Sequence, residues 1–114
     1  MSVEFQSNEN NNGIVTLEVK GEIDMNSSSE VREKLTPYFE NNKKAVIVDL
    51  AGVSYIDSSG IATLVEGLQW SHTSNNRFRL TGLSSSVKDI FEIAHLLNVF
   101  EIFDSIEDAL IGIA

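Results

Sequence analysis

The strongest constraint on the fold is a short apolar segment, residues 45–50, that is followed closely by the pattern of an amphipathic helix. The segment is apolar at nearly every position instead of alternating, which is typical of a central strand that helices cover on at least one face of the sheet. Downstream, Ile61, Leu64, Val65 and Leu68 recur at helical spacing. A buried strand that leads into a helix predicts an α/β fold with mostly parallel strands.

The rest of the chain continues this alternation of strands and helices. Residues 3–6 and the alternating residues 15–19 flank an Asn-rich turn and predict a β-hairpin. Further strands are expected at residues 77–80 and 99–103. Helices are expected to begin at the capping residues Ser27, Ser58, Ser84 and Asp104. The predicted order is β-β-α-β-α-β-α-β-α. We expect a single α/β domain over residues 1–114, with helices packed on a mixed, mostly parallel sheet.

Two details of the first helix are expected from its sequence. The hydroxyl of Ser27 is suited to cap the helix, while Glu30, three residues later, reaches back to complete a capping box. Pro37 lacks the N–H that would bond to the carbonyl of Glu33, so we expect a kink or an early stop near Leu35.

Composition excludes several classes of function. Eight Lys and Arg residues against seventeen Asp and Glu residues give a formal net charge of −9, which opposes nucleic-acid binding and would speed association with a basic protein surface. No apolar run approaches the roughly 18 residues of a membrane span, and no secretory leader pattern is present, so we expect a cytoplasmic protein without direct membrane insertion. There is no cysteine, and His72 and His95 have no ligand spacing around them, so we expect no disulfide, no metal and no cofactor.

The motif with the most chemical meaning is Asp57-Ser58-Ser59-Gly60, at the predicted start of the helix after the buried strand. A side chain at this position points out of the helix and is within reach of a kinase. Backbone N–H groups at a helix N-terminus favour anions, so we expect them to hold a phosphate on Ser58, which would add roughly two negative charges to the surface. Spacing by itself favours an ordinary N-cap serine, and the two roles are compatible.

The neighbours of Ser58 each allow two interpretations. Asp57 either orients an incoming kinase or its metal, or complements the helix dipole. Ser59 is either a second acceptor or the actual cap, and Gly60 either permits the close approach of another backbone or tolerates the turn geometry. Asp24 follows the second strand and is either a binding residue at a loop edge or a solvated turn residue. Met25 beside it is either an exposed apolar contact or an internal plug.

These residues resemble the STAS family, the short α/β domain shared by sulfate transporters and anti-sigma factor antagonists, and in particular the free-standing bacterial antagonists. The likeness covers essentially the whole chain. Its specific parts are Gly-Glu-Ile-Asp at residues 21–24 and Val-Ser-Tyr-Ile-Asp-Ser-Ser-Gly-Ile at residues 53–61, supported by the strand at 46–50.

The resemblance implies a site and a set of partners. The first serine of the Asp-Ser-Ser-Gly motif, Ser58 here, would be the phosphoacceptor of an anti-sigma factor that is itself a serine kinase using ATP. A metal-dependent serine phosphatase would reverse the reaction. The unphosphorylated domain would bind the kinase and displace a sigma factor or other effector. The surface facing the kinase would include Asp24, Asp57, Ser58, Ser59 and Gly60.

The resulting hypothesis is a regulatory binding module and not an enzyme. An alternative is a cytoplasmic accessory subunit of a membrane lipid transporter or of a stress-signalling assembly, in which the same surface docks permanently. A small hydrolase is a third class, but Ser58 would then need a general base, and no histidine is placed near it by sequence.

Overall fold

The computed structural model describes residues 3–10 and 12–113, and in this part of the chain it confirms the predicted order of elements. The bounds are β1 (Val3–Glu9), β2 (Ile14–Ile23), α1 (Ser28–Glu40), β3 (Ala45–Ile56), α2 (Ser58–Ser74), β4 (Arg77–Thr81), α3 (Ser85–Ile93), β5 (Glu101–Phe103) and α4 (Ile106–Ala109). None of the described helices is both long enough and apolar enough to cross a lipid bilayer.

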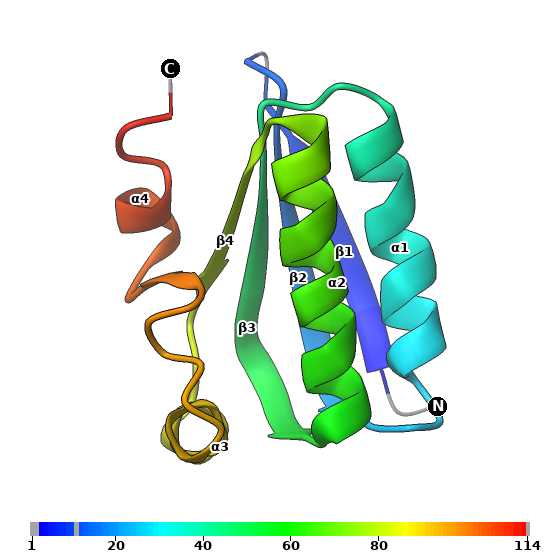
Figure 1. Ribbon diagram of the computed structural model, residues 1–114, viewed down its shortest axis with the longest axis vertical. Coiled ribbons are helices and arrows are strands. Elements are labelled where there is room, and N and C mark those ends of the chain that lie inside the picture. The colour runs from blue at the N-terminus through cyan, green and yellow to red at the C-terminus, as the bar shows by residue number, and fades with distance from the viewer. Residues whose placement is uncertain (1–2, 11, 114) are drawn as a thin grey trace.

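The strands form one sheet in the order β1-β2-β3-β4-β5. The predicted hairpin is confirmed, because β1 pairs antiparallel with β2, while the pairs from β2 to β5 are all parallel. Figure 1 shows α1 and α2 side by side in front of the sheet and α4 beside β4 at its other side. The sheet is therefore mixed and mostly parallel, as expected, with helices packed on it.

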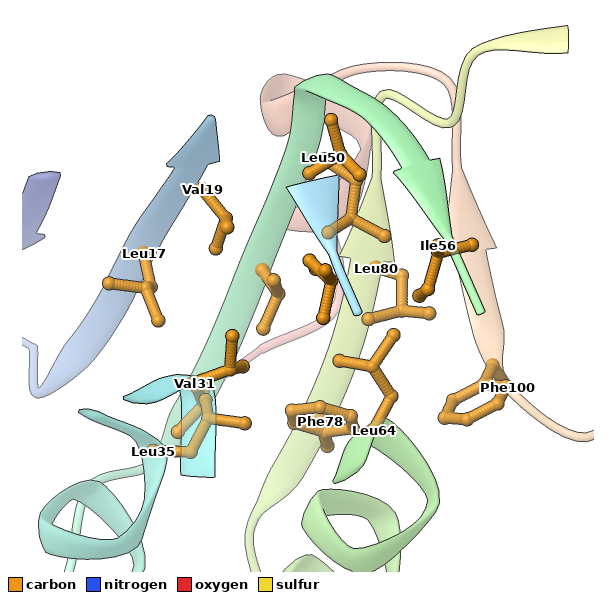
Figure 2. Close-up of a cluster of buried hydrophobic side chains, with 14 of the residues drawn as sticks. Leu17, Val19, Val31, Leu35, Leu50, Ile56, Leu64, Phe78, Leu80 and Phe100 are labelled. Atoms are coloured by element: carbon orange, nitrogen blue, oxygen red, sulfur yellow. The ribbon is translucent and has the colours of Figure 1, made fainter. Parts of the chain in front are cut away.

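The central strand β3 is covered on both faces, which explains its continuous apolar run. Val46, Val48 and Leu50 point into the larger core under α1 and α2, whereas Ala45 and Ile47 point into a smaller cluster on the opposite face. Figure 2 shows the larger core, where the helix residues Val31, Leu35 and Leu64 face side chains of β2, β3 and β4. Ala109 of α4 completes the smaller cluster.

Two expectations about helix caps are wrong, and one of the two outcomes expected at Pro37 does not occur. Ser27 is the N-cap residue of α1, but its hydroxyl makes no capping bond and instead donates to the carbonyl of Glu22 over 2.7 Å. Of the kink or early stop expected near Leu35, the early stop does not occur, because α1 continues through Pro37 to Glu40. The last helix is capped not by Asp104 but by Ser105, whose hydroxyl accepts from the Asp108 N–H over 3.1 Å.

The helix α2 lies close to the sheet because small residues line much of its inner face. The fully buried positions include Gly60, Thr63, Gly67 and Ser71, whereas the predicted stripe contributes Leu64 and partly buried neighbours. A Cβ placed on Gly67 would lie 2.9 Å from the Phe78 ring, so this position has no room for a larger residue.

The alternating segment around Arg79 is a strand, as predicted, but the arginine is buried, with only 8% of its side chain exposed. Its Nη1 donates to the carbonyls of Ala109 and Ile111 over 2.9 and 2.6 Å, and its Nε donates to Glu101 over 2.8 Å. The guanidinium also lies 5.0 Å from the centre of the Phe103 ring. Arg79 therefore attaches the C-terminal segment to the sheet through charge-assisted hydrogen bonds.

Candidate functional site

The candidate site lies where the carboxyl ends of β2 and β3 meet the start of α2. Ile23 and Ile56, the last residues of these strands, are partners in the parallel register. The N–H of Asp57 donates to the carbonyl of Ile23 over 3.1 Å and so joins the start of α2 to the loop that follows β2. In Figure 1 this region is the lower end of the molecule, where the β2 to α1 connection passes close to the first turn of α2. Loops at the carboxyl ends of parallel strands commonly carry binding residues.

Ser58 is the first residue of α2 and is exposed, as expected from its place in the sequence. The strand before it is longer than predicted, because β3 runs to Ile56 instead of ending at Leu50. Only Asp57 separates the strand from the helix. The hydroxyl-bearing residue is thus placed by two rigid elements and not by a long loop.

Asp57 is the N-cap residue of α2, so the expectation that Ser58 or Ser59 caps this helix is wrong. Its Oδ1 accepts from the N–H of Ser59 over 2.9 Å and from the N–H of Gly60 over 3.2 Å. Its backbone is extended, with φ −111° and ψ −172°, as N-cap residues commonly are. The Asp57 carboxylate already occupies both of these amides, so a phosphate on Ser58 would have to compete with it for them.

The hydroxyl of Ser59 is bound to the same carboxylate. Ser59 Oγ donates to Asp57 Oδ1 over 2.6 Å, and Ser59 is only half-exposed. This bond is the largest cause of a lowered pKa for Asp57, and the backbone N–H groups of Gly60, Ser59 and Met25 lower the pKa further by favouring the charged carboxylate. The two serines of the motif therefore differ, because Ser58 is exposed and Ser59 is engaged.

Gly60 lies beneath this surface. A Cβ there would come within 2.7 Å of side-chain atoms of both Ile23 and Ile56 and within 2.9 Å of the Ile23 carbonyl oxygen. The close approach that its missing side chain permits is thus to the backbone of β2 within the same chain. Gly60 shapes the site by letting α2 begin directly against the end of β2.

The loop after β2 is organised by Ser27, a residue that the sequence analysis treated only as a helix cap. Its buried Oγ accepts from the N–H of Asp24 over 3.0 Å, in addition to its bond with Glu22. Asp24 is half-buried, and its Oδ1 accepts from the N–H of Asn26 over 2.9 Å. Asp24 therefore stabilises its own turn while part of its side chain remains accessible.

Two apolar side chains are exposed near this loop. Met25 is 78% exposed, which settles the open question between an exposed contact and an internal plug. Tyr55 is 47% exposed and is the register partner of Glu22, one residue before the end of β3. Tyr55 was not predicted as a site residue. Its signal was the position between buried Val53 and Ile56, where an aromatic residue follows Ser54 at two consecutive exposed positions of the strand.

The site combines an exposed alcohol, that of Ser58, with several carboxylates at the same end of the molecule. Glu22, Asp24 and Asp57 all belong to the two segments that meet here. His72 lies in the last turn of α2, at the opposite end of the helix from Ser58. Within residues 3–10 and 12–113, no three or more His, Cys, Asp or Glu side chains are grouped so that they could hold a metal ion.

Comparison with known proteins gives a consistent result. A family model described as "STAS domain" matches residues 6–109. The anti-sigma-B factor antagonist of Staphylococcus aureus is 29% identical over 91 residues, which are 80% of this chain and 84% of that protein. The anti-sigma-B factor antagonist of Listeria monocytogenes is 29% identical over 102 residues, 90% of each chain.

Solved structures share the fold. An anti-sigma factor antagonist from Mycobacterium paratuberculosis superposes with a TM-score of 0.88 at 19% identity and covers 98% of this chain and 94% of its own. The antagonist SpoIIAA in its unphosphorylated form gives a TM-score of 0.73 at 19% identity, with coverage of 95% and 94%.

Proposed function

The chain belongs to the STAS domain family, and from this premise we propose that it is an anti-sigma factor antagonist that acts by partner switching. In this proposal the unphosphorylated domain binds an anti-sigma factor serine kinase and releases a sigma factor or other effector. The kinase transfers phosphate from ATP to Ser58, and binding is lost. A serine phosphatase restores the binding form. The domain is a regulatory binding module in the cytoplasm and not an enzyme, with no cofactor of its own.

The choice of Ser58 over Ser59 as the phosphoacceptor rests on one observation. Ser58 is exposed at the start of α2, whereas the Ser59 hydroxyl donates to Asp57 over 2.6 Å. A kinase that takes up Ser59 would first have to break this charge-assisted bond. The difference supports Ser58 as the residue that is modified, in agreement with the position implied by the family motif.

The occupied helix N-terminus supports an electrostatic switch. Because Asp57 takes the Ser59 and Gly60 N–H groups, a phosphate on Ser58 would not be neutralised by them and would add roughly two negative charges to an acidic surface. At about 5 Å from an acidic group of the partner, with an effective dielectric near 20, each charge pair would cost about 3 kcal/mol, which is roughly a hundredfold in affinity. One modification is then sufficient to dissociate a micromolar complex.

The proposed binding surface combines charge with apolar contacts. Asp24, Asp57, Ser58 and Ser59 supply its polar part, and Gly60 supports it from beneath. The exposed side chains of Met25 and Tyr55 extend it on the side of the β2 loop. Exposed apolar residues within a polar rim are typical of protein-binding surfaces.

The phosphorylation step is tested with proteins captured from the native cytoplasm on the immobilised chain. The captured fraction is incubated with ATP, and the peptide that contains Ser58 and Ser59 is sequenced by mass spectrometry. Phosphate on Ser58 is expected in the wild type and in Ser59→Ala, and none is expected in Ser58→Ala. Phosphate confined to Ser59 would contradict the proposal. Stable capture of a membrane transporter without any phosphorylation would favour the accessory-subunit alternative.

A further inference from the structure

The sheet has an open edge at β1, at the opposite end of the strand order from β5. Among the described strands β1 pairs only with β2, so the other edge of this seven-residue strand faces no strand in the described part of the chain. The N–H and C=O groups along such an edge are a template for pairing with another strand. Strand β1 contains no proline, which would interrupt this pairing.

A groove of about 740 Å³ lies between β1 and the outer side of α1, the two elements at the right of Figure 1. Its lining comes from Val3, Glu4 and Phe5 of the strand and from Glu30, Glu33 and Lys34 of the helix. The arrangement of an open strand edge beside a helix is suited to an extended peptide, which would pair with the strand and place alternate side chains against the helix.

The groove combines apolar surface with acidic side chains. Phe5 is partly buried against the core and supplies apolar surface to the groove, whereas Val3 is buried and supplies almost none. Three of the lining residues, Glu4, Glu30 and Glu33, are acidic. The one cation among the lining residues is Lys34, whose ammonium lies 5.7 Å from the centre of the Phe5 ring and is engaged there by a cation–π contact.

We propose that this groove binds an extended basic segment of a partner protein, which adds to β1 as a further strand and directs lysine or arginine side chains toward Glu30 and Glu33. A second copy of the chain is a poorer match, because Glu4 and Glu9 are the charged residues of β1 and the whole chain has a net charge of −9. The proposal does not rest on the antagonist role, because the groove and the Ser58 site are built from different residues.

The test uses a synthetic peptide of alternating lysine and valine, six residues long with blocked ends, and the full chain labelled with ¹⁵N. We expect the peptide to shift the backbone amide signals of β1 and of the first half of α1. The double variant Glu30→Lys/Glu33→Lys is expected to weaken binding at least about tenfold, because two attractions become repulsions. Glu40→Lys, an exposed change of the same kind at the far end of α1, is the matched control and is expected to bind like the wild type.

Two further peptides separate strand addition from simple charge attraction. A peptide with glutamate in place of lysine is expected not to bind. The lysine peptide with an N-methyl group on every residue keeps its charge but loses the backbone donors on both edges, and it is expected to lose most of its affinity. The proposal is overturned if no amide shifts occur at millimolar peptide, if the shifts lie outside β1 and α1, or if the N-methylated peptide or the charge-reversed variant binds equally well. Sedimentation that shows a dimer broken by charge reversal in β1 would assign the edge to a second copy instead.

Discussion

The hydroxyl of Ser59 donates to the carboxylate of Asp57 over 2.6 Å, and this bond is shorter than those that the same carboxylate accepts from the Ser59 and Gly60 N–H groups, at 2.9 and 3.2 Å. One side chain thus caps α2 and engages the second serine of the motif. The first serine, Ser58, remains exposed beside it. Adjacent residues of the motif thus have different roles.

Replacing Asp57 with alanine is expected to destabilise the domain by about 1 kcal/mol, because the N–H groups of Ser59 and Gly60 lose their acceptor. Urea unfolding of wild type and Asp57→Ala at neutral pH measures the difference. Ser58→Ala, one position later and exposed, is the control and is expected to leave the free energy of unfolding nearly unchanged. Equal losses in the two variants would contradict the assignment of the cap.

The stabilisation by Asp57 is expected to depend on pH. Its pKa is lowered in the folded state, mainly by the Ser59 hydroxyl, so the folded state favours the ionised carboxylate. The contribution is therefore complete above the unfolded pKa of about 3.9 and is lost as the pH falls through the lower folded pKa. Unfolding of wild type and Asp57→Asn between neutral and acidic pH measures this. As the pH falls, the free energy of unfolding of the wild type should decrease relative to that of Asp57→Asn. A difference that does not change with pH would contradict the prediction.

The bond between Asp57 and Ser59 is also expected to restrict phosphorylation to one hydroxyl. In Asp57→Ala the Ser59 hydroxyl loses its acceptor, so a captured kinase with ATP is expected to modify Ser59 as well as Ser58. Fragment-ion mass spectrometry distinguishes the two positions. Ser59→Ala in the Asp57→Ala background should return the chain to a single phosphate. Unchanged selectivity for Ser58 in Asp57→Ala would show that the kinase alone chooses the residue.

Gly60→Ala is expected to destabilise the domain by about 1–3 kcal/mol, as overpacking usually does. The added Cβ would meet both Ile23 and Ile56 at 2.7 Å, although alanine is the better helix former. Thermal or urea unfolding checks the sign. A more stable Gly60→Ala variant would mean that α2 begins farther from β2 than described.

Arg79→Met is expected to lower the free energy of unfolding by about 2 kcal/mol or more, because the buried guanidinium loses bonds to Glu101, Ala109 and Ile111. Hydrogen exchange should become faster over residues 106–111 in particular. Arg77→Gln is the matched control, since Arg77 is exposed and pairs with Glu101 only at 3.4 Å. A similar effect in both variants would contradict the specific role of Arg79.

The order of elements was predictable because it depends on local periodicity. The continuous apolar run of β3 and the helical spacing after Ser58 each indicate one structure, and both predictions are confirmed. The exposure of Ser58 followed from the same reasoning, since the first residue of a helix points outward.

The details that were not predictable depend on contacts between distant or chemically similar residues. Asp57, Ser58 and Ser59 are all good capping residues, so their order in the sequence does not say which one caps. The hydroxyl of Ser27 bonds to Glu22 in the preceding strand and not to the helix. Arg79 is buried because its partners include carbonyls about 30 residues later in the chain, and strand alternation carries no information about them.

The central claim is that a phosphate on Ser58 ends an interaction with a kinase. Its most direct test is the affinity of the captured kinase for two forms of the chain, one with serine and one with phosphoserine at position 58, with Ser58→Ala as a form that cannot be modified. The account predicts equal binding to the serine and alanine forms and roughly hundredfold weaker binding to the phosphoserine form. Equal affinity for the serine and phosphoserine forms would contradict it.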